Sequence, residues 1–528
     1  MLRSSRARVV LFTAVTVAAL GAAREAQAAG DFLVNSHTTD HQYGASARRL
    51  AGGDFVVAWH MSGEDDLFGV WVRRFDPSGT PLGPQVRVNA YTTGFQGGAS
   101  VAADPAGGFV IVWASNGQDG DNDAIVGRRY DASGASLGDE FLVNTFTESR
   151  QWQPAVAVGP SGGFVVVWSS FGGDGMHYGV MGQRYDATGA ALGSEFQVNT
   201  FTTYIQANAE VAMDGTGRFV VVWSSAQDVS STGIFGQRFE ASGLPLGPEF
   251  PINTFTTGPQ GDPDVAADAD GNFVAVWTGS GDQDGGGGGV FAQRYDATGA
   301  AQGPEFRVNT YTTGAQDAAA VAWDDQGHFL VSWTSDSQDG SDLGVFARRY
   351  RADGAALGPE FRINAYTTGQ QSTPAVATVP DGGFLVAWTD WHQQGASDIY
   401  GRIIPDLIFA DGVESAGLGA WSSAATGGGD LSVSPAAALV GTQGLQAVVD
   451  DTAGLFVQDD LPEDEGRYRA RFWLDPNGFD PGESAGKRRT RVLLAFQDAP
   501  TRRLMAVVLR RISGQYALMG RARRDDNS

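Results

Sequence analysis

The sequence contains no cysteine, which excludes disulfides, thiolate metal ligands and a lipid-modified cysteine anchor. Histidine is scarce: there are 6, and no two of them have the HxH or HExxH spacing typical of metal sites. Basic residues are too few to balance the acidic ones, since 36 Lys and Arg stand against 60 Asp and Glu and give a net charge of −24. This acidic excess argues against binding to nucleic acid or to anionic membranes.

Long apolar runs are also rare, and the one of note lies at the N-terminus. Residues 1–28 begin with Arg3, Arg6 and Arg8, continue with VVLFTAVTVAALGAA and end in the small-residue site AQA. This order is typical of a secretory signal peptide cleaved near Ala28. The run is shorter than a membrane span, and no later segment reaches that length. The sequence therefore predicts an exported protein, secreted or held at the cell surface or in the periplasm, without membrane insertion.

No helical period occurs between the signal and residue 405, and a unit of 54 to 56 residues recurs there seven times. In each copy a tryptophan follows an asparagine by 24 residues. The asparagines are Asn35, Asn89, Asn144, Asn199, Asn253, Asn309 and Asn364, and the tryptophans are Trp59, Trp113, Trp168, Trp223, Trp277, Trp333 and Trp388. Counted from the asparagine, Thr recurs at position +3, Gln at +7, Gly at +18 and Phe at +20.

Each copy is expected to form four short strands. In the third copy these are Pro154–Val158, Phe164–Trp168, Gly179–Asp186 and Glu195–Asn199, and the links between them are rich in Gly, Asp and Ser, which favour turns. The second strand, FVVVW, is apolar on both sides, as in strands covered on both faces. The sequence predicts an all-β fold with a seven-bladed β-propeller over residues 29–405. A β-solenoid is the alternative, although its coils are usually shorter than this unit.

The two ends of the repeat region are offset by one strand. The segment Asp31–Asn35 matches the fourth strand of the other copies, whereas the seventh copy stops after its third strand at Asp398–Arg402. Pairing these two segments would complete the last blade and remove two open sheet edges. The offset therefore predicts a propeller closed by an N-terminal strand.

The repeat ends near Pro405, and residues 406–528 read as alternating strands with acidic or Gly-rich turns, which predicts a β-sandwich. The unit VNTYTTGxQ…FVVVW…GQRYD, over residues 31–404, resembles a repeat common in exported bacterial proteins. The segment FADGVESAGLGAW (409–421) resembles the FADGFESG…W start of a laminin-G-like or concanavalin-like jelly roll. In that family several strands follow the point matching Arg523–Ser528, so the resemblance implies a truncated or incomplete sandwich. It supplies no catalytic residues.

The polar residues that recur in every copy are expected to satisfy buried backbone groups or to link neighbouring blades. Function in a closed array is expected where one or two blades depart from the repeat. Length varies only between the tryptophan and the arginine of the QRYD-like segment, from 14 to 17 residues. These loops lie on one face of the predicted propeller, which is therefore the predicted binding face.

One of these loops carries alternating carboxylates at Asp119, Asp121 and Asp123. Hard cations such as calcium need several converging oxygens, so this loop is a candidate calcium site. The EF-hand pattern is broken at Ala124, and a solvated turn is the alternative.

Aromatic and histidine residues that depart from the repeat are candidate ligand contacts, because exposed rings suit sugars or peptides. They are Phe68, Trp71, Phe171, His177, Tyr178, Trp391 and His392. Ordinary packing between blades is the alternative. No nucleophile–base set, phosphate-binding loop or paired catalytic carboxylate stands out. The sequence therefore predicts a non-enzymatic binding protein, with a glycan or protein ligand at the variable loops. The alternative is a glycan-active hydrolase or lyase that uses the propeller face.

Overall fold

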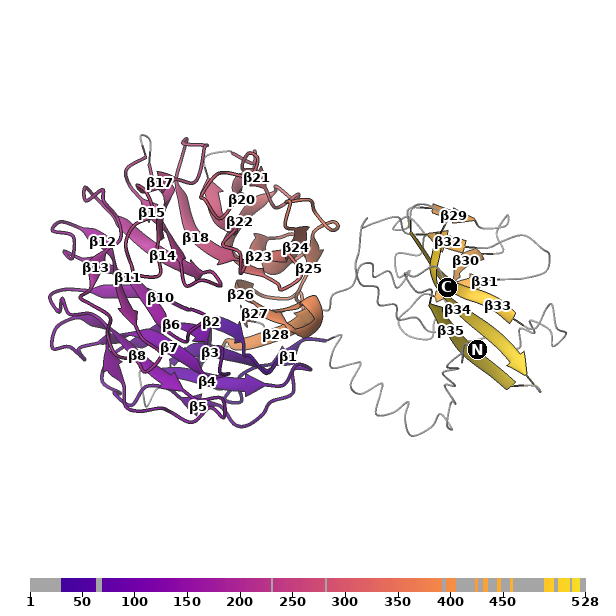
Figure 1. The fold of residues 1–528 in the computed structure, drawn as a ribbon, viewed down its shortest axis with the longest axis horizontal. Helices are drawn as coiled ribbons and strands as arrows, with labels where there is room; N and C mark the ends of the chain where they lie inside the picture. The colour runs from indigo at the N-terminus through magenta and orange to yellow at the C-terminus, as the bar shows by residue number, and fades with distance from the viewer. Residues whose placement is uncertain are drawn as a thin grey trace, which may run out of the picture. The chain divides into compact units, whose positions relative to one another are not determined.

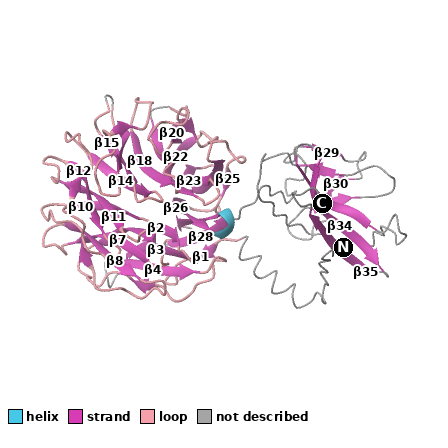
Figure 2. Cartoon of the chain, in the orientation of Figure 1, coloured by secondary structure: helices cyan, strands magenta, loops and turns pink. Residues whose placement is uncertain are grey.

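The computed structural model describes residues 30–62, 69–228, 231–280, 283–391 and 396–404, together with seven strands between residues 423 and 522. The chain forms two compact units, one of which spans Ala26–Ile408. The described part is almost entirely strand and turn, and its one helical element is the short 3-10 helix η1 (Pro380–Gly382) (Figure 2). The fold is therefore all-β and β-propeller-like. The predicted signal peptide, residues 1–28, lies outside the described residues.

The first strand of each repeat unit is the innermost strand of its sheet, and these strands number the sheets 1 to 7. The inner strands are β2 (His41–Arg49), β6 (Gln96–Ala103), β10 (Gln151–Val158), β14 (Gln206–Met213), β18 (Gln260–Ala267), β22 (Gly314–Trp323) and β26 (Gln371–Val379). Each packs beside the inner strands of the two neighbouring sheets, and β26 packs beside β2. The inner strands therefore surround a common centre (Figure 1).

The second and third strands of each sheet carry most of its apolar residues. The second strands are β3 (Phe55–Ser62), β7 (Phe109–Asn116), β11 (Phe164–Phe171), β15 (Phe219–Ser225), β19 (Phe273–Ser280), β23 (His328–Asp336) and β27 (Gly383–Asp390). The third strands are β4 (Gly69–Phe75), β8 (Asp123–Tyr130), β12 (Tyr178–Tyr185), β16 (Gly233–Phe239), β20 (Gly287–Tyr295), β24 (Leu343–Arg351) and β28 (Asp398–Ile404). Consecutive strands within each unit pair antiparallel. A short parallel pairing of β20 with β22 also joins sheets 5 and 6 into one eight-stranded sheet.

The fourth strands are only two residues long and lie at the outer edge. They are β5 (Val86–Arg87), β9 (Phe141–Leu142), β13 (Phe196–Gln197), β17 (Phe250–Pro251), β21 (Phe306–Arg307) and β25 (Phe361–Arg362). In sheet 7 this place is taken by β1 (Phe32–Leu33), which pairs antiparallel with β28. An ion pair of 2.6 Å between Asp31 and Arg402 holds the same edge, so the N-terminal segment completes the sheet that ends the repeat.

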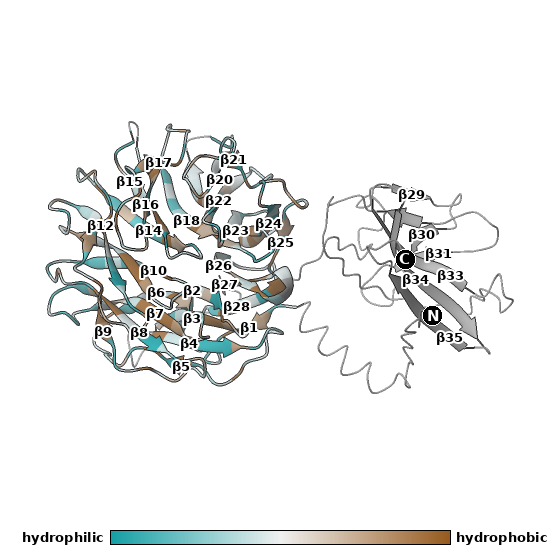
Figure 3. Ribbon diagram, in the orientation of Figure 1, coloured by the Kyte–Doolittle hydropathy of each residue, from teal (hydrophilic) through white to brown (hydrophobic). Residues whose placement is uncertain are grey.

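The hydrophobic core lies between neighbouring sheets. One buried cluster, for example, joins Val56 and Val70 of sheet 1 to Ile111 and Trp113 of sheet 2. The strands carry apolar stretches, drawn in brown in Figure 3. The second strands are apolar on both faces because each sheet is covered on both sides. All seven repeat tryptophans are at most 1% exposed, so they are structural.

The repeat asparagine ties the third strand of one sheet to the segment that enters the next. Asn199 Oδ1 accepts a hydrogen bond from the backbone N–H of Val180 on β12 at 2.7 Å, and its amide nitrogen donates to the carbonyl of Phe201 at 2.8 Å. The same strand–asparagine bond recurs in all seven units. The pairs are Val70–Asn89, Ile125–Asn144, Val180–Asn199, Ile234–Asn253, Val290–Asn309, Val345–Asn364 and Ile399–Asn35.

The second unit contributes three small sheets. Its described strands are β29 (Ser423–Ala425), β30 (Leu431–Ser434), β31 (Gly444–Ala447), β32 (Phe456–Gln458), β33 (Arg489–Gln497), β34 (Arg502–Ile512) and β35 (Gln515–Ala522). β29 pairs with β32, β30 with β31, and β33, β34 and β35 form one antiparallel sheet. The part of the chain that the structure describes offers no helix with the length and hydrophobicity of a membrane span.

Asn199→Ala is expected to lower the free energy of unfolding by about 2 kcal/mol, because it leaves the buried N–H of Val180 without an acceptor. The measurement is the denaturant midpoint of the purified protein. Thr200→Ala, at the exposed next residue, is the matched control and should stay within about 0.5 kcal/mol of the native protein. Equal midpoints for the two variants would contradict the structural role of the asparagine.

Candidate functional site

Each inner strand carries a β-bulge at the end nearest the variable loops. The register with the second strand shifts by one residue, for example between Tyr43 and Ser46. The residue at position +9 has a positive φ in all seven sheets. These residues are Gly44, Gly98, Gln153, Asn208, Asp262, Ala318 and Thr373. A bulge re-aims the side chains that follow it. Position +11, two residues further along, therefore has an orientation that simple alternation does not give.

At position +11 the side chains of neighbouring sheets meet around the centre of the ring. Ser46 Oγ accepts the N–H of Val101 in the next sheet at 3.1 Å, and Asp264 Oδ2 accepts the N–H of Val321 in the next sheet at 2.8 Å. Inner strands have one edge without a partner strand, and these side chains satisfy its donors. Position +11 therefore lines the edge of the inner strands that faces the centre.

Sheets 4 and 5 place carboxylates at this position, Glu210 on β14 and Asp264 on β18. The two strands are adjacent, and the charge of Asp264 raises the pKa of Glu210, so the side chains are close neighbours. Arg48, on β2 of sheet 1, interacts electrostatically with both carboxylates from across the ring. We call Glu210, Asp264 and Arg48 the axial site.

The two carboxylates have different surroundings. Asp264 accepts hydrogen bonds from the backbone N–H groups of Val321 and Val265, at 2.8 and 2.7 Å. Within the described residues, Glu210 accepts none. Burial and the charge of Asp264 raise the pKa of Glu210 to about 8, although Arg48 acts in the opposite sense. Burial also raises the pKa of Asp264, but its backbone donors and Arg48 oppose this. The two carboxyl groups therefore titrate as a coupled pair, in which the backbone donors favour the charged form of Asp264 and Glu210 has no such donors among the described residues.

The axial site is surrounded by protein without being sealed. Glu210 and Asp264 are both half-buried, so part of each residue contacts solvent. The far end of the inner strands, away from the variable loops, is spanned by an ion pair of 2.7 Å between Arg49 of sheet 1 and Asp325 of sheet 6. The variable-loop end carries no such bridge among the described residues.

More acidic side chains lie at the variable-loop end of sheets 5 and 6. Asp262 is exposed and accepts a hydrogen bond from Asn208 of sheet 4 at 2.7 Å. Burial, together with the charges of Asp262 and Asp336, raises the pKa of Asp317. The variable-loop end is therefore strongly acidic at sheets 5 and 6.

The predicted ligand contacts divide into three groups. Phe171, His177 and Tyr178 do come together, with ring centroids of Phe171 and Tyr178 at 5.2 Å, and Phe171 is 39% exposed. Trp391 is also 39% exposed and lies 5.1 Å from the ring of His41.

Trp71, by contrast, packs partly buried against the core between sheets 7 and 1, which is ordinary inter-sheet packing. Phe68 and His392 lie outside the described residues.

The three carboxylates of the candidate calcium loop each have a separate protein partner. Asp119 accepts from the amide of Asn144 at 3.1 Å, Asp121 from the N–H of Ser149 at 2.7 Å, and Asp123 forms an ion pair of 2.6 Å with Arg150. Among the described residues, no group of three or more acidic, histidine or cysteine side chains is arranged to hold a metal ion. Calcium binding at this loop stays a prediction.

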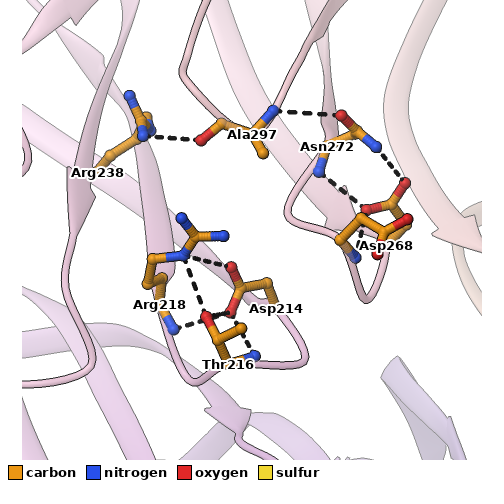
Figure 4. Close-up of polar contacts among 8 residues, drawn as sticks. Asp214, Thr216, Arg218, Arg238, Asp268, Asn272 and Ala297 are labelled. Carbon is orange, nitrogen blue, oxygen red and sulfur yellow. Dashed lines mark hydrogen bonds and ion pairs between the residues drawn. The ribbon is translucent and has the colours of Figure 1, made fainter.

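A small pocket between sheets 4 and 5 contains charged residues, but these are structural (Figure 4). Asp214 caps its turn and forms an ion pair of 2.8 Å with Arg218. Arg238 donates to the carbonyl of Ala297 at 2.9 Å, and Asn272 accepts from the N–H of the same residue. These polar groups are occupied in holding turns of neighbouring sheets together, so the pocket offers no reactive pair.

The axial residues were missed from sequence, although the repeat contains a signal for them. Position +11 is Ser or Ala in the other five copies and acidic only at Glu210 and Asp264. Position +13 is Ala in six copies and Arg only at Arg48. Variation in length points to the loops between the tryptophan and the arginine. The departures from the repeat at Glu210, Asp264 and Arg48 lie instead in strands of constant length.

The chain is similar to known proteins in its fold. No protein-family model matches the chain, and no curated protein matches it. Among solved structures it is similar to a protein of unknown function from Dyadobacter fermentans, with a TM-score of 0.47 and 13% identity over 71% of this chain and 98% of that one. It is also similar to an alpha-L-arabinanase from Penicillium chrysogenum (TM-score 0.42, 14% identity, 71% and 98% covered) and to the phage phi92 endosialidase (0.42, 10%, 93% and 87%).

These findings contradict the prediction of a non-enzymatic binding protein. Several of the similar structures are named as arabinanases, an arabinofuranosidase or an endosialidase, which are glycan-active enzymes. Identities between 10 and 16% concern the fold alone, so the chemistry has to be argued from the residues of this chain.

If calcium occupies the loop of Asp119, Asp121 and Asp123, it should stabilise the folded state by RT ln(1 + [L]/Kd), about 2.7 kcal/mol at a hundred-fold excess over Kd. The melting temperature should then rise in millimolar calcium relative to chelator, and Asp121→Ala should abolish the rise. An unchanged melting curve would leave the loop as a turn held by its protein partners.

Glu210→Gln is expected to raise thermal stability by a few degrees near pH 8 and to leave it almost unchanged near pH 4. Folding raises the pKa of Glu210 from 4.5 to about 8, so ionising it costs folding free energy as the pH rises through that window. Glutamine keeps the shape and removes the cost. The check is the melting temperature of both proteins across this range, with exposed Glu240→Gln as the control. If the difference in melting temperature between the native protein and the Glu210→Gln variant does not grow with pH, folding does not raise the pKa of Glu210.

Proposed function

We propose that the protein is an exported glycan-active hydrolase whose reaction takes place at the axial site. In this proposal the seven sheets are the blades of one closed propeller, and residues 406–528 form a β-sandwich. The ring of inner strands and the place of β1 in sheet 7 support closure. The apolar, arginine-led start of residues 1–28 supports export.

The observation that carries the proposal is the pair of neighbouring carboxylates, Glu210 and Asp264, in different surroundings: Asp264 accepts two backbone hydrogen bonds, and Glu210 accepts none among the described residues. Glycoside hydrolysis needs this arrangement: one carboxylic acid to protonate the leaving oxygen and one carboxylate to assist at the sugar carbon. When two carboxyl groups lie close together and are partly desolvated, the charge of one raises the pKa of the other, and this requires no metal ion. Such pairs with opposed environments mark acid and base roles in enzymes.

Glu210 would be the general acid. It keeps its proton at neutral pH, is partly exposed and has no competing hydrogen bond among the described residues. It would transfer this proton to the glycosidic oxygen as the bond to the sugar carbon breaks, and the departing sugar would leave as an alcohol.

Asp264 would be the second carboxylate. Its two backbone donors fix one orientation and keep it charged, so that it faces the positive charge that develops at the sugar carbon. It would either activate a water molecule or attack that carbon directly. The anomeric form of the first product distinguishes these two courses.

Arg48 would balance the negative charge of the pair. It favours the ionised form of both carboxylates and limits how far their pKa values rise. The positive charge of Arg48 comes from sheet 1, on the opposite side of the ring from sheets 4 and 5. The axial site would therefore depend on closure of the ring, which places sheet 1 opposite the carboxylates.

Glu210→Gln and Asp264→Asn are each expected to lower the rate of polysaccharide hydrolysis by about 100-fold or more. The assay is release of reducing ends from a panel that includes arabinan, galactan, xylan and mixed-linkage glucan. Glu240→Gln, at an exposed turn, should retain full activity. The activity of the native protein should fall above about pH 8, because Glu210 then loses the proton it donates.

The controls decide the assignment. Full activity of Glu210→Gln would remove the axial site from the reaction. No reducing ends from any polymer of the panel, with folded native protein, would contradict a glycan hydrolase of this substrate range.

A further inference from the structure

The variable-loop end of the inner strands carries a row of aromatic rings that the proposed reaction does not use. The rings of Tyr43 and His60 lie 4.4 Å apart, those of His60 and Phe95 lie 6.2 Å apart, and those of Phe95 and Trp152 lie 5.5 Å apart. The guanidinium of Arg150 covers the ring of Trp152 at 3.9 Å. We call Tyr43, His60, Phe95 and Trp152 the ring row.

The repeat itself shows that the ring row is not part of the recurring core, although Trp152 also contacts the core between sheets 2 and 3. Core aromatics recur in every copy, whereas each member of the ring row is unique to its copy. Position +8 is Tyr43 in sheet 1 and Trp152 in sheet 3 but Gly, Ala, Asp or Ser in the other copies. Position +25 is His60 in sheet 1 and Ala, Ser or Thr elsewhere, and position +6 is aromatic only at Phe95, apart from the imidazole of His41.

The ring row is partly exposed and almost free of charge. All four side chains are half-buried, so they present surface to solvent. Burial lowers the pKa of His60 to about 4, which leaves its ring neutral at physiological pH. Arg150 is neutralised by its ion pair with Asp123. A neutral aromatic surface of this kind suits the apolar faces of sugar rings.

The ring row also leads to the axial site. It crosses sheets 1, 2 and 3 and ends at Trp152, on the inner strand beside that of Glu210. Trp152 stands three positions before position +11, or about 10 Å along a strand. The other side of the same end, in sheets 5 and 6, carries Asp262, Asp317 and Asp336, which would repel anionic groups.

We propose that the ring row binds consecutive sugar residues of a neutral polysaccharide and leads its chain to the axial carboxylates. This proposal deepens the hydrolase function and rests on it. It implies a chain-binding enzyme that engages several sugars, and it excludes uronate or sialate polymers as preferred substrates. The acidic edge argues against a lyase for the same reason, because such enzymes act on the carboxylated sugars that this edge repels.

The experiment measures binding and turnover separately. Binding of the Glu210→Gln variant to the neutral polymers of the panel is followed by affinity electrophoresis and calorimetry. Adding Trp152→Ala, Phe95→Ala or Tyr43→Ala to this variant should weaken binding at least ten-fold. In the otherwise native protein, the same changes should raise KM with little change in kcat, because the rings bind ground and transition states alike.

The matched control is Trp323→Ala. Trp323 also lies on an inner strand, β22, is also half-buried and also packs against an aromatic ring, Phe329, at 5.3 Å, but at the end away from the variable loops. It should change neither binding nor KM. Melting curves of all variants show whether a loss of binding reflects a loss of folding.

The charge of the substrate is tested with polygalacturonate and its carboxyl-reduced, neutral counterpart. The Glu210→Gln variant should bind the neutral form more tightly, and Asp262→Asn with Asp317→Asn should reduce the difference. Tighter binding of the anionic form would overturn the proposal for a neutral substrate.

The failures are distinguishable. If Glu210→Gln stops hydrolysis but Trp152→Ala binds and turns over as its parent does, the ring row is not the binding surface and the hydrolase function stands. If Glu210→Gln retains hydrolysis, the axial site fails, whatever the ring row binds. If the folded Glu210→Gln variant binds no polymer of the panel, the ring-row proposal is contradicted.

Discussion

The architecture depends on one hydrogen-bonded residue in each unit, the repeat asparagine. The outermost strand pairs with the third strand over only two residues. The next backbone N–H group of the third strand therefore has no acceptor on the outermost strand. The asparagine supplies the next acceptor and at the same time fixes the segment that enters the neighbouring sheet. Because such a buried donor is costly to leave unpaired, this contact sets where each sheet ends and how the next begins. Its recurrence in all seven units explains why the asparagine never changes.

A scaffold fixed in this way tolerates unfavourable residues at its centre. The carboxyl groups of Glu210 and Asp264 are partly desolvated and close together, which destabilises their charged forms. Ser46 and Ser100, at the equivalent position of sheets 1 and 2, only complete hydrogen bonds to the next sheet. Replacing such residues by carboxylates sacrifices some stability, which a large core of stacked sheets can supply, and the proposed function gives a reason for the replacement.

Much of the fold could be predicted from sequence because strand period, turn chemistry and a fixed repeat all point to the same structure. The pairing of Phe32 and Leu33 with β28 follows from counting strands. The axial site could not be found in this way, because its residues lie beyond a bulge at which a non-glycine residue such as Asn208 adopts a positive φ. The direction of a side chain past a bulge cannot be derived from alternation. The neutral state of His60 and the ion pair between Asp123 and Arg150 likewise depend on packing that no spacing reveals.

The departures from the repeat are not scattered around the ring. At positions +6 and +8 the Phe, Tyr and Trp replacements lie on sheets 1 to 3, at Tyr43, Phe95 and Trp152, whereas the acidic replacements at positions +8 to +11 lie on sheets 4 to 6 and include Glu210 and Asp264. Seven identical units would offer seven equal and weak sites, because symmetry gives each copy the same surface. Dividing the ring into an apolar half that can hold a chain and an acidic half that can act on it creates a single site with a direction. In the proposed function the two halves meet where β10 lies beside β14, so the boundary between sheets 3 and 4 is where a bound chain would pass from the aromatic rings to the carboxylates.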